Sequence, residues 1–456
     1  MRAFKFDYSD ITDALIAPTV TDYVFRRLLP VLCKSAVAGV VAGVLVTLFN
    51  LALEYLSEIA QYLGYEAGGG KLPLATYILV MAFAAVFMAF FIKVLPEARG
   101  SGIPRTEAFM CGKKKLDWKK MCFATVVGSC VSFLSGLPVG AEGPSVQFGG
   151  GLGAGVEEMG GNDEKARRYV ANSGVAAGVA SAFIAPVTGI LFVMEEVQRK
   201  FNPLMLASAC ISVIYAITLR NCLGAALGMK AVFFDVVGLG VIPVEMWWLI
   251  LPMGIFAAVA ARIFNASILC MDKLSSRSKL PVWSFIPVLF LVVMIVNIFL
   301  PQNIGSGATI ISSIFDGEYS WRSVLLLLAV KFVLVVLVFR AAPTGGMMVP
   351  MLAIGAMIGA LVGFIGTEAG LPEIAVPMAA LITMSAFFGS CIGAPITVVA
   401  LFAETTGIVD SYVLLPVVLT VLVAQIVSKL LFQKPLYDTL WERDVHREAA
   451  KAAANA

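Results

Sequence analysis

The chain has 456 residues, of which 59% are hydrophobic and only 14% carry a formal charge. Soluble proteins usually carry about 25% charged residues, so this composition excludes an ordinary soluble globular protein and indicates an integral membrane protein. The formal net charge is +3, and the Lys and Arg residues stand in short clusters between apolar runs. We therefore expect a lipid bilayer around the chain and no nucleic-acid partner.

The first 30 residues lack the apolar core of a signal peptide, and they contain four aspartates, at positions 7, 10, 13 and 22. Residues 1–30 are therefore interpreted as an N-terminal cytoplasmic or interfacial segment. No metal spacing occurs among the eight cysteines, and we expect no cofactor.

Apolar segments of spanning or near-spanning length then follow one another along the chain. They lie at about 31–56, 73–95, 121–139, 203–219, 243–268, 281–300, 321–339, 347–366, 374–402 and 411–432. Several are interrupted by Gly or Pro, as at Gly136–Pro138, Pro186, Pro343–Pro350 and Pro395. Interrupted apolar segments are typical of helices that stop partway through a membrane. The sequence therefore predicts an all-α integral membrane protein built from broken helices.

Basic clusters between these segments indicate which loops face the cytoplasm. The densest cluster lies in 113–120, a second is Arg199–Lys200, and the C-terminal region holds Lys434, Arg443 and Arg447. We expect these three regions to be cytoplasmic, with residues 438–456 as a short cytoplasmic tail. Both termini then lie on the same side of a cell membrane, and we expect that membrane to be a bacterial inner membrane.

The stretch Gly140-Ala141-Glu142-Gly143-Pro144 places an acid beside a proline suited to the first turn of a helix. The free N–H groups and the positive dipole end of such a helix can hold an anion, and the Glu142 carboxylate can compete for the same place. A carboxylate at the centre of a bilayer costs several kcal/mol by some scales, so an acid there is functional by default. This stretch predicts an anion pathway with Glu142 as its gate.

The chain contains an internal repeat. Three motifs recur in the same order at offsets of 205, 206 and 209 residues: Gly100-Ser101-Gly102 with Gly305-Ser306-Gly307, Gly140–Pro144 with Gly346–Pro350, and Ala185–Thr188 with Ala394–Thr397. We therefore predict two related membrane halves, 31–220 and 221–437, with the binding site at their interface.

The repeat separates structural acids from functional ones. Glu195 and Glu404 stand seven residues after the threonines of the third motif pair, so both halves keep this acid and we interpret it as structural. Glu142 and Glu196 have no acidic counterpart in the second half, which favours them for chemistry. Glu196 also precedes Arg199 by three residues, the spacing of a helical ion pair, so a structural role for Glu196 stays open.

Four motifs together resemble the CLC chloride channel and transporter family: Gly100–Pro104, Gly140–Ser145, Gly346–Pro350 and Lys434-Pro435-Leu436-Tyr437. The resemblance runs in order from about residue 31 to residue 440. It implies two inverted halves of tilted and broken helices, and a homodimer with a separate anion pathway in each subunit.

The resemblance also implies the residues that contact the anion. Ser101 and Tyr437 match the family's hydroxyl contacts to a central chloride, and the backbone around Met347, Met348, Val349 and Gly143 matches its N–H donors. From the residues alone, Ser101 can also be a helix cap and Tyr437 a membrane-interface tyrosine.

For proton movement, Glu142 resembles the gating glutamate and Glu196 the internal proton-transfer glutamate of the exchanger branch. The chain departs from the family pattern at Ala141, where a basic residue is usual, and at Met348, where an aromatic residue is usual. These features predict a secondary active chloride/proton exchanger rather than an enzyme. The alternatives are a passive anion channel gated by Glu142 and a fluoride/proton exchanger. The departures at Ala141 and Met348 keep the fluoride exchanger open, whereas Ser101 and Tyr437 disfavour it.

Overall fold

The computed structural model describes residues 5–7, 24–110, 117–161, 163–230, 232–234, 236, 244–277 and 280–443. Most of the predicted N-terminal segment, positions 113–116 of the basic cluster and the tail beyond residue 443, including Arg447, lie outside the described residues. Within the described part the chain is predominantly helical, as predicted.

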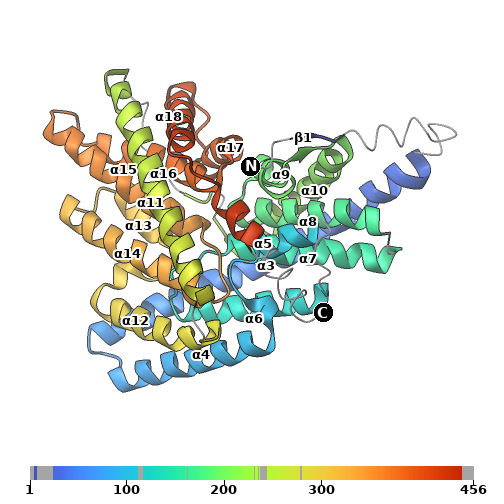
Figure 1. The fold of residues 1–456 in the computed structure, drawn as a ribbon, viewed down its shortest axis with the longest axis horizontal. Helices are drawn as coiled ribbons and strands as arrows, with labels where there is room; N and C mark the ends of the chain where they lie inside the picture. The colour runs from blue at the N-terminus through green and yellow to red at the C-terminus, as the bar shows by residue number, and fades with distance from the viewer. Residues whose placement is uncertain are drawn as a thin grey trace.

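The first half contains a series of helices of very different lengths (Figure 1). They are η1 (Val24–Leu28), α3 (Leu29–Gly68), α4 (Leu74–Val94), η2 (Pro96–Ala98), α5 (Ile103–Met110), α6 (Trp118–Leu134), α7 (Glu142–Gly160), α8 (Glu164–Phe183), α9 (Pro186–Phe192), η3 (Val193–Gln198) and α10 (Pro203–Leu227). Two short strands, β1 (Lys5–Phe6) and β2 (Lys200–Phe201), pair in parallel.

The second half repeats this alternation of long and short helices. They are η4 (Val244–Leu249), α11 (Ile250–Arg277), η5 (Val282–Phe285), α12 (Ile286–Phe299), η6 (Pro301–Asn303), α13 (Ala308–Phe315), α14 (Trp321–Ala341), α15 (Met348–Glu368), α16 (Ala375–Ile392), α17 (Pro395–Thr406) and α18 (Ser411–Leu430). A final helical stretch at 436–443, the short red helix near the centre of Figure 1, crosses the boundary predicted at residue 438.

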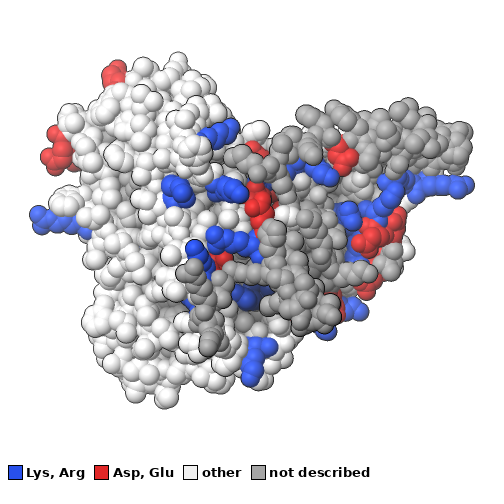
Figure 2. Space-filling model, viewed as in Figure 1, with Lys and Arg blue, Asp and Glu red and all other residues white. Residues whose placement is uncertain are grey.

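Nine helices in the described part of the chain are long and apolar enough to cross a membrane, and the protein is a multi-pass membrane protein. The apolar segment at 374–402 is two helices, because Gly393 ends α16 with φ 76° and Pro395 begins α17. Every residue of α16 is buried, so this helix lies in the protein interior rather than against lipid. Large apolar side chains are instead exposed on peripheral helices such as α4, where Phe83 is 75% exposed. Figure 2 shows an almost uncharged surface over the lower left of the view, with most of the charged residues gathered at the centre and right.

Reciprocal main-chain hydrogen bonds join the two halves. Gly140 and Gly346, partners in the repeat, form an antiparallel bridge with N–H···O distances of 2.8 and 2.7 Å. The N–H of Gly100 donates to the carbonyl of Ala342, and the N–H of Gly305 donates to that of Gly136, at 3.0 and 3.2 Å. Equivalent residues thus make equivalent bonds in both directions, which is the signature of inverted repeats around a pseudo-two-fold axis.

Candidate functional site

Glu142 lies at the junction of the two halves, where α7 begins next to the Gly140–Gly346 bridge. The residue is 3% exposed. Backbone N–H groups of Ala141, of Glu142 itself and of Val349 face its carboxylate, so donors arrive from both halves. Its Oε2 atom is enclosed and finds no hydrogen-bond partner among the described residues. The Glu142 carboxylate therefore occupies a position in which these N–H groups could bind an anion.

Glycine permits three segments to meet beside this carboxylate. A Cβ at Gly143 would overlap the carbonyl oxygen of Ser101 and would lie 3.0 Å from the Cα of Gly346. Ser101 itself stands between Gly100 and Gly102, whose φ angles of 77° and 78° form the turn that leads into α5. The Ser101 turn, the start of α7 and the start of α15 therefore converge, as the motifs predict.

Tyr437 reaches the same region from the C-terminal helical stretch. The residue is fully buried, and its hydroxyl has no hydrogen-bond partner in the described part of the chain. It lies within electrostatic range of both Glu142 and Glu196. Gln433 Nε2 donates to the Ser390 carbonyl at 2.8 Å, and this bond fixes the approach to Tyr437. Its burial argues against the alternative of a membrane-interface tyrosine.

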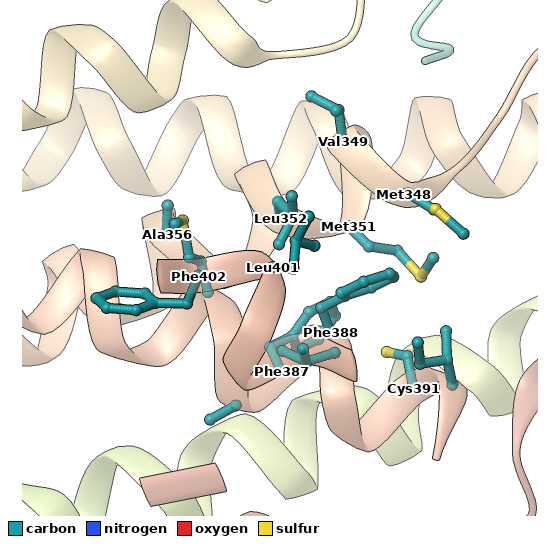
Figure 3. Close-up of a cluster of buried hydrophobic side chains, with 14 of the residues drawn as sticks. Met348, Val349, Met351, Leu352, Ala356, Phe387, Phe388, Cys391, Leu401 and Phe402 are labelled. Atoms are coloured by element: carbon teal, nitrogen blue, oxygen red, sulfur yellow. The ribbon is translucent and has the colours of Figure 1, made fainter. Parts of the chain in front are cut away.

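The wall formed by α15 and α16 is apolar. Met347, Met348 and Val349 are 4%, 2% and 1% exposed. In Figure 3, Met348 and Met351 extend towards the same side as Phe388 and Cys391 of α16, whereas Val349 points away from them. The donors that this wall offers are therefore backbone N–H groups at the start of α15, free of intrahelical partners.

Glu196 lies in η3 and is 2% exposed. Its Oε2 pairs with the Arg199 guanidinium at 3.1 Å, so the ion pair suggested by the spacing is present. The same guanidinium pairs with Asp438 at 2.5 Å, and Glu107 of α5 lies within electrostatic range of Glu196. Sequence reasoning missed Asp438 and Glu107 because no local pattern links them to Glu196. The sequence offered one indication that Asp438 lies near the site, because Asp438 directly follows Tyr437.

In the second half, the turn equivalent to the Ser101 turn is bound by a buried lysine. Lys331 of α14 is fully buried, and its Nζ donates to the carbonyls of Asn303 and Gly305 at 2.9 and 2.7 Å. A lysine therefore binds the turn at Gly305-Ser306-Gly307. The sequence signal was available, since Lys331 lies in the middle of the apolar segment 321–339, whose other charged residue, Arg322, stands at its start.

These features define a class of protein: an internally duplicated membrane transporter or channel with a buried acid at the interface of its halves. Comparisons with known proteins narrow the class. The Voltage gated chloride channel family matches residues 81–429. The H(+)/Cl(-) exchange transporter ClcA of Vibrio parahaemolyticus is 30% identical over 444 residues, which cover 94% of this chain and 93% of that protein. ClcA of Vibrio cholerae (strain M66-2) is 30% identical over 436 residues, 92% of this chain and 90% of that protein.

Solved structures share the fold. A slow cyanobacterial Cl-/H+ antiporter has a TM-score of 0.81 at 24% identity, covering 92% of this chain and 99% of its own. A CLC-type fluoride/proton antiporter has a TM-score of 0.74 at 22% identity, covering 91% and 98%. The chain belongs to the voltage-gated chloride channel (CLC) family, as the motifs predicted.

Proposed function

We propose that this protein is a secondary active transporter that exchanges chloride for protons across a membrane. The observation that carries the proposal is the placement of Glu142: a buried carboxylate with an unpartnered oxygen, where N–H groups from both halves converge. The relatives named as H(+)/Cl(-) exchange transporters support the same activity.

The chloride ligands are neutral donors. Transfer of a bare anion into a low-dielectric interior costs tens of kcal/mol by an idealised Born estimate. Helix N-termini, each equivalent to about half a positive charge, compensate this cost without a fixed cation that would hold the ion too tightly. The start of α15 at Met348–Val349 supplies such N–H groups, and the start of α7 at Gly143 supplies others. Ser101 and Tyr437 add hydroxyl donors from the cytoplasmic side.

Exchange follows from the two states of Glu142. The ionised carboxylate occupies an anion position and blocks the pathway. When it binds a proton it becomes neutral, leaves that position to chloride and carries its proton outward. Glu196, which like Glu142 lies within electrostatic range of Tyr437, passes protons to and from the cytoplasm. In this scheme chloride and protons share Glu142 but reach it by separate inner routes.

The family resemblance supports a proposal for the assembly and the location of the protein. The protein is a homodimer with one pathway in each subunit. It lies in a bacterial inner membrane with both termini cytoplasmic, the side on which Arg199 and Lys200 stand.

Reconstituted liposomes test the function. With an outward chloride gradient and no proton gradient, the purified protein should drive uphill proton uptake, and a protonophore should abolish that uptake. Glu196→Gln should retain chloride flux and lose proton uptake. Chloride flux without proton movement in the parent protein would establish the passive channel instead. Proton uptake with a fluoride gradient but none with chloride would establish the fluoride exchanger.

A further inference from the structure

A single arginine links the proposed proton route to the helix that carries the proposed chloride contact. Arg199 follows η3 and adopts a left-handed backbone conformation with φ 51°. From that position one guanidinium nitrogen contacts Glu196 at 3.1 Å and the other contacts Asp438 at 2.5 Å. The two carboxylates come from segments 242 residues apart in the sequence, so this bridge exists only in the folded protein.

The bridge is enclosed. The side chains of Arg199 and Asp438 are each 9% exposed, and that of Glu196 is 2% exposed. Charges in such a setting interact strongly, and removal of one partner leaves the other charges buried without compensation. The state of Glu196 therefore affects how firmly Arg199 holds Asp438. Among the described residues, Glu107 of α5 and the Tyr437 hydroxyl also lie within electrostatic range of Glu196.

Asp438 directly follows Tyr437, so the bridge holds the helical turn from which the Tyr437 side chain projects. The other side of this segment is fixed to α16, where Pro435 packs on Gly393 and Gln433 bonds to the Ser390 carbonyl. The segment thus has a rigid attachment at α16 and a charged attachment at Arg199. Of these two attachments, only the one at Arg199 can respond to a proton that Glu196 takes up.

We propose that the Arg199–Asp438 bridge couples proton occupancy of Glu196 to the position of Tyr437, so that both residues act as positioning residues for exchange. When Glu196 is ionised, it shares the guanidinium with Asp438. When Glu196 takes up a proton, Arg199 pairs with Asp438 alone and holds Tyr437 against the anion position. Chloride is thereby kept from leaking towards the cytoplasm while the proton passes. This proposal rests on the proposed exchange function and specifies how its inner side is regulated.

The test measures protons moved per chloride in liposomes, together with the chloride flux itself. Coupling between sites commonly amounts to a factor of 5–150, so Asp438→Asn should lower the proton-to-chloride ratio by about fivefold or more and raise chloride flux. Asp438→Glu keeps the carboxylate and should restore most of the ratio. Arg199→Lys keeps the charge but cannot reach both carboxylates with a planar fork, so it should give an intermediate ratio.

The chain provides a matched control. Arg443 pairs with Asp272 of α11 at 3.0 Å, and this ion pair fixes the same C-terminal helix without contacting Glu196. Asp272→Asn should lower the melting temperature, as Asp438→Asn does, yet leave the ratio unchanged.

The outcomes separate the two proposals. If the parent protein moves no protons against their gradient, the exchange function itself fails. If the parent exchanges and folded Asp438→Asn keeps the parental ratio, the bridge has no coupling role. An equal loss of ratio in Asp272→Asn would reduce the bridge to a fold contact. If Asp438→Asn does not fold, Arg199→Lys decides: a parental ratio in that variant overturns the proposal.

Discussion

Glu404 of α17 accepts the backbone N–H of Thr188 at 2.8 Å, and its Oε2 also accepts the Thr188 hydroxyl at 2.7 Å. The pseudo-symmetric mate is present: Glu195 accepts the N–H and the hydroxyl of Thr397, both at 2.7 Å. Each half therefore caps the N-terminus of a short helix in the other half with a carboxylate. This arrangement confirms the structural interpretation of the repeated acid. It also leaves the unrepeated acids, Glu142 and Glu196, as the candidates for transport.

Glu404→Gln and Glu195→Gln should each destabilise the protein by a similar amount. A glutamine keeps the shape but loses a charged acceptor for three donors, and hydrogen bonds to charged groups are worth about 1.5–3 kcal/mol each. Thermal unfolding in detergent, followed by tryptophan fluorescence, measures both variants. A clear loss of thermal stability in one variant and none in the other would show that the two caps are not equivalent.

Glu142→Gln should uncouple chloride flux from protons. The amide approximates the protonated acid in size and charge, so it no longer competes as an anion, and it cannot carry a proton. Chloride flux should persist and become insensitive to pH, while chloride-driven proton uptake should vanish. Continued proton pumping by the variant would remove Glu142 from the gate. Glu157→Gln supplies a control, because Glu157 is a fully buried acid at the opposite end of the same helix from Glu142. Glu157 pairs with Lys34 at 2.7 Å.

Ser101→Ala combined with Tyr437→Phe should weaken chloride binding. Each change removes one neutral hydroxyl donor and little volume, and a hydrogen bond to a charged group contributes about 1.5–3 kcal/mol. Chloride affinity by calorimetry should therefore fall by at least tenfold in the double variant, since about 1.4 kcal/mol corresponds to tenfold. Ser306→Ala is the matched control, because Ser306 is the repeat counterpart whose hydroxyl lies near the Ala308 N–H. Parental affinity in the double variant would exclude both hydroxyls from the site.

Lys331→Met should lower stability without changing the proton-to-chloride ratio. The substitution leaves the carbonyls of Asn303 and Gly305 without their buried donor, and each unsatisfied group costs about 1–3 kcal/mol. Partial repacking around an apolar side chain offsets part of that cost. The melting temperature and the flux ratio should be measured on one preparation. An altered ratio at parental stability would implicate the second-half turn in transport.

Much of this architecture was readable from the sequence because the repeat preserves order and spacing. Offsets near 206 residues correctly paired Gly140 with Gly346, and the structure joins these two glycines by reciprocal hydrogen bonds. The same offsets separated Glu195 and Glu404 from Glu142 and Glu196. The glycine-rich helices α7 and α8 are absent from the apolar segments predicted from the sequence. Their small residues allow close contact, as where a Cβ at Gly149 would overlap the Gly174 carbonyl, but these residues contribute little hydropathy.

Tertiary structure alone decided which side chains meet around Glu196. The sequence placed Glu196 three residues from Arg199, and the structure added Asp438 to the same guanidinium. It likewise brought Lys331 to the turn at Gly305, 26 residues earlier in the chain. Helical periodicity predicts which residues are neighbours within one segment. Repeat offsets predict which residues of the two halves are equivalent. A contact between non-equivalent residues of distant segments depends on how whole helices pack, because a buried charge must find its partner wherever that packing places one.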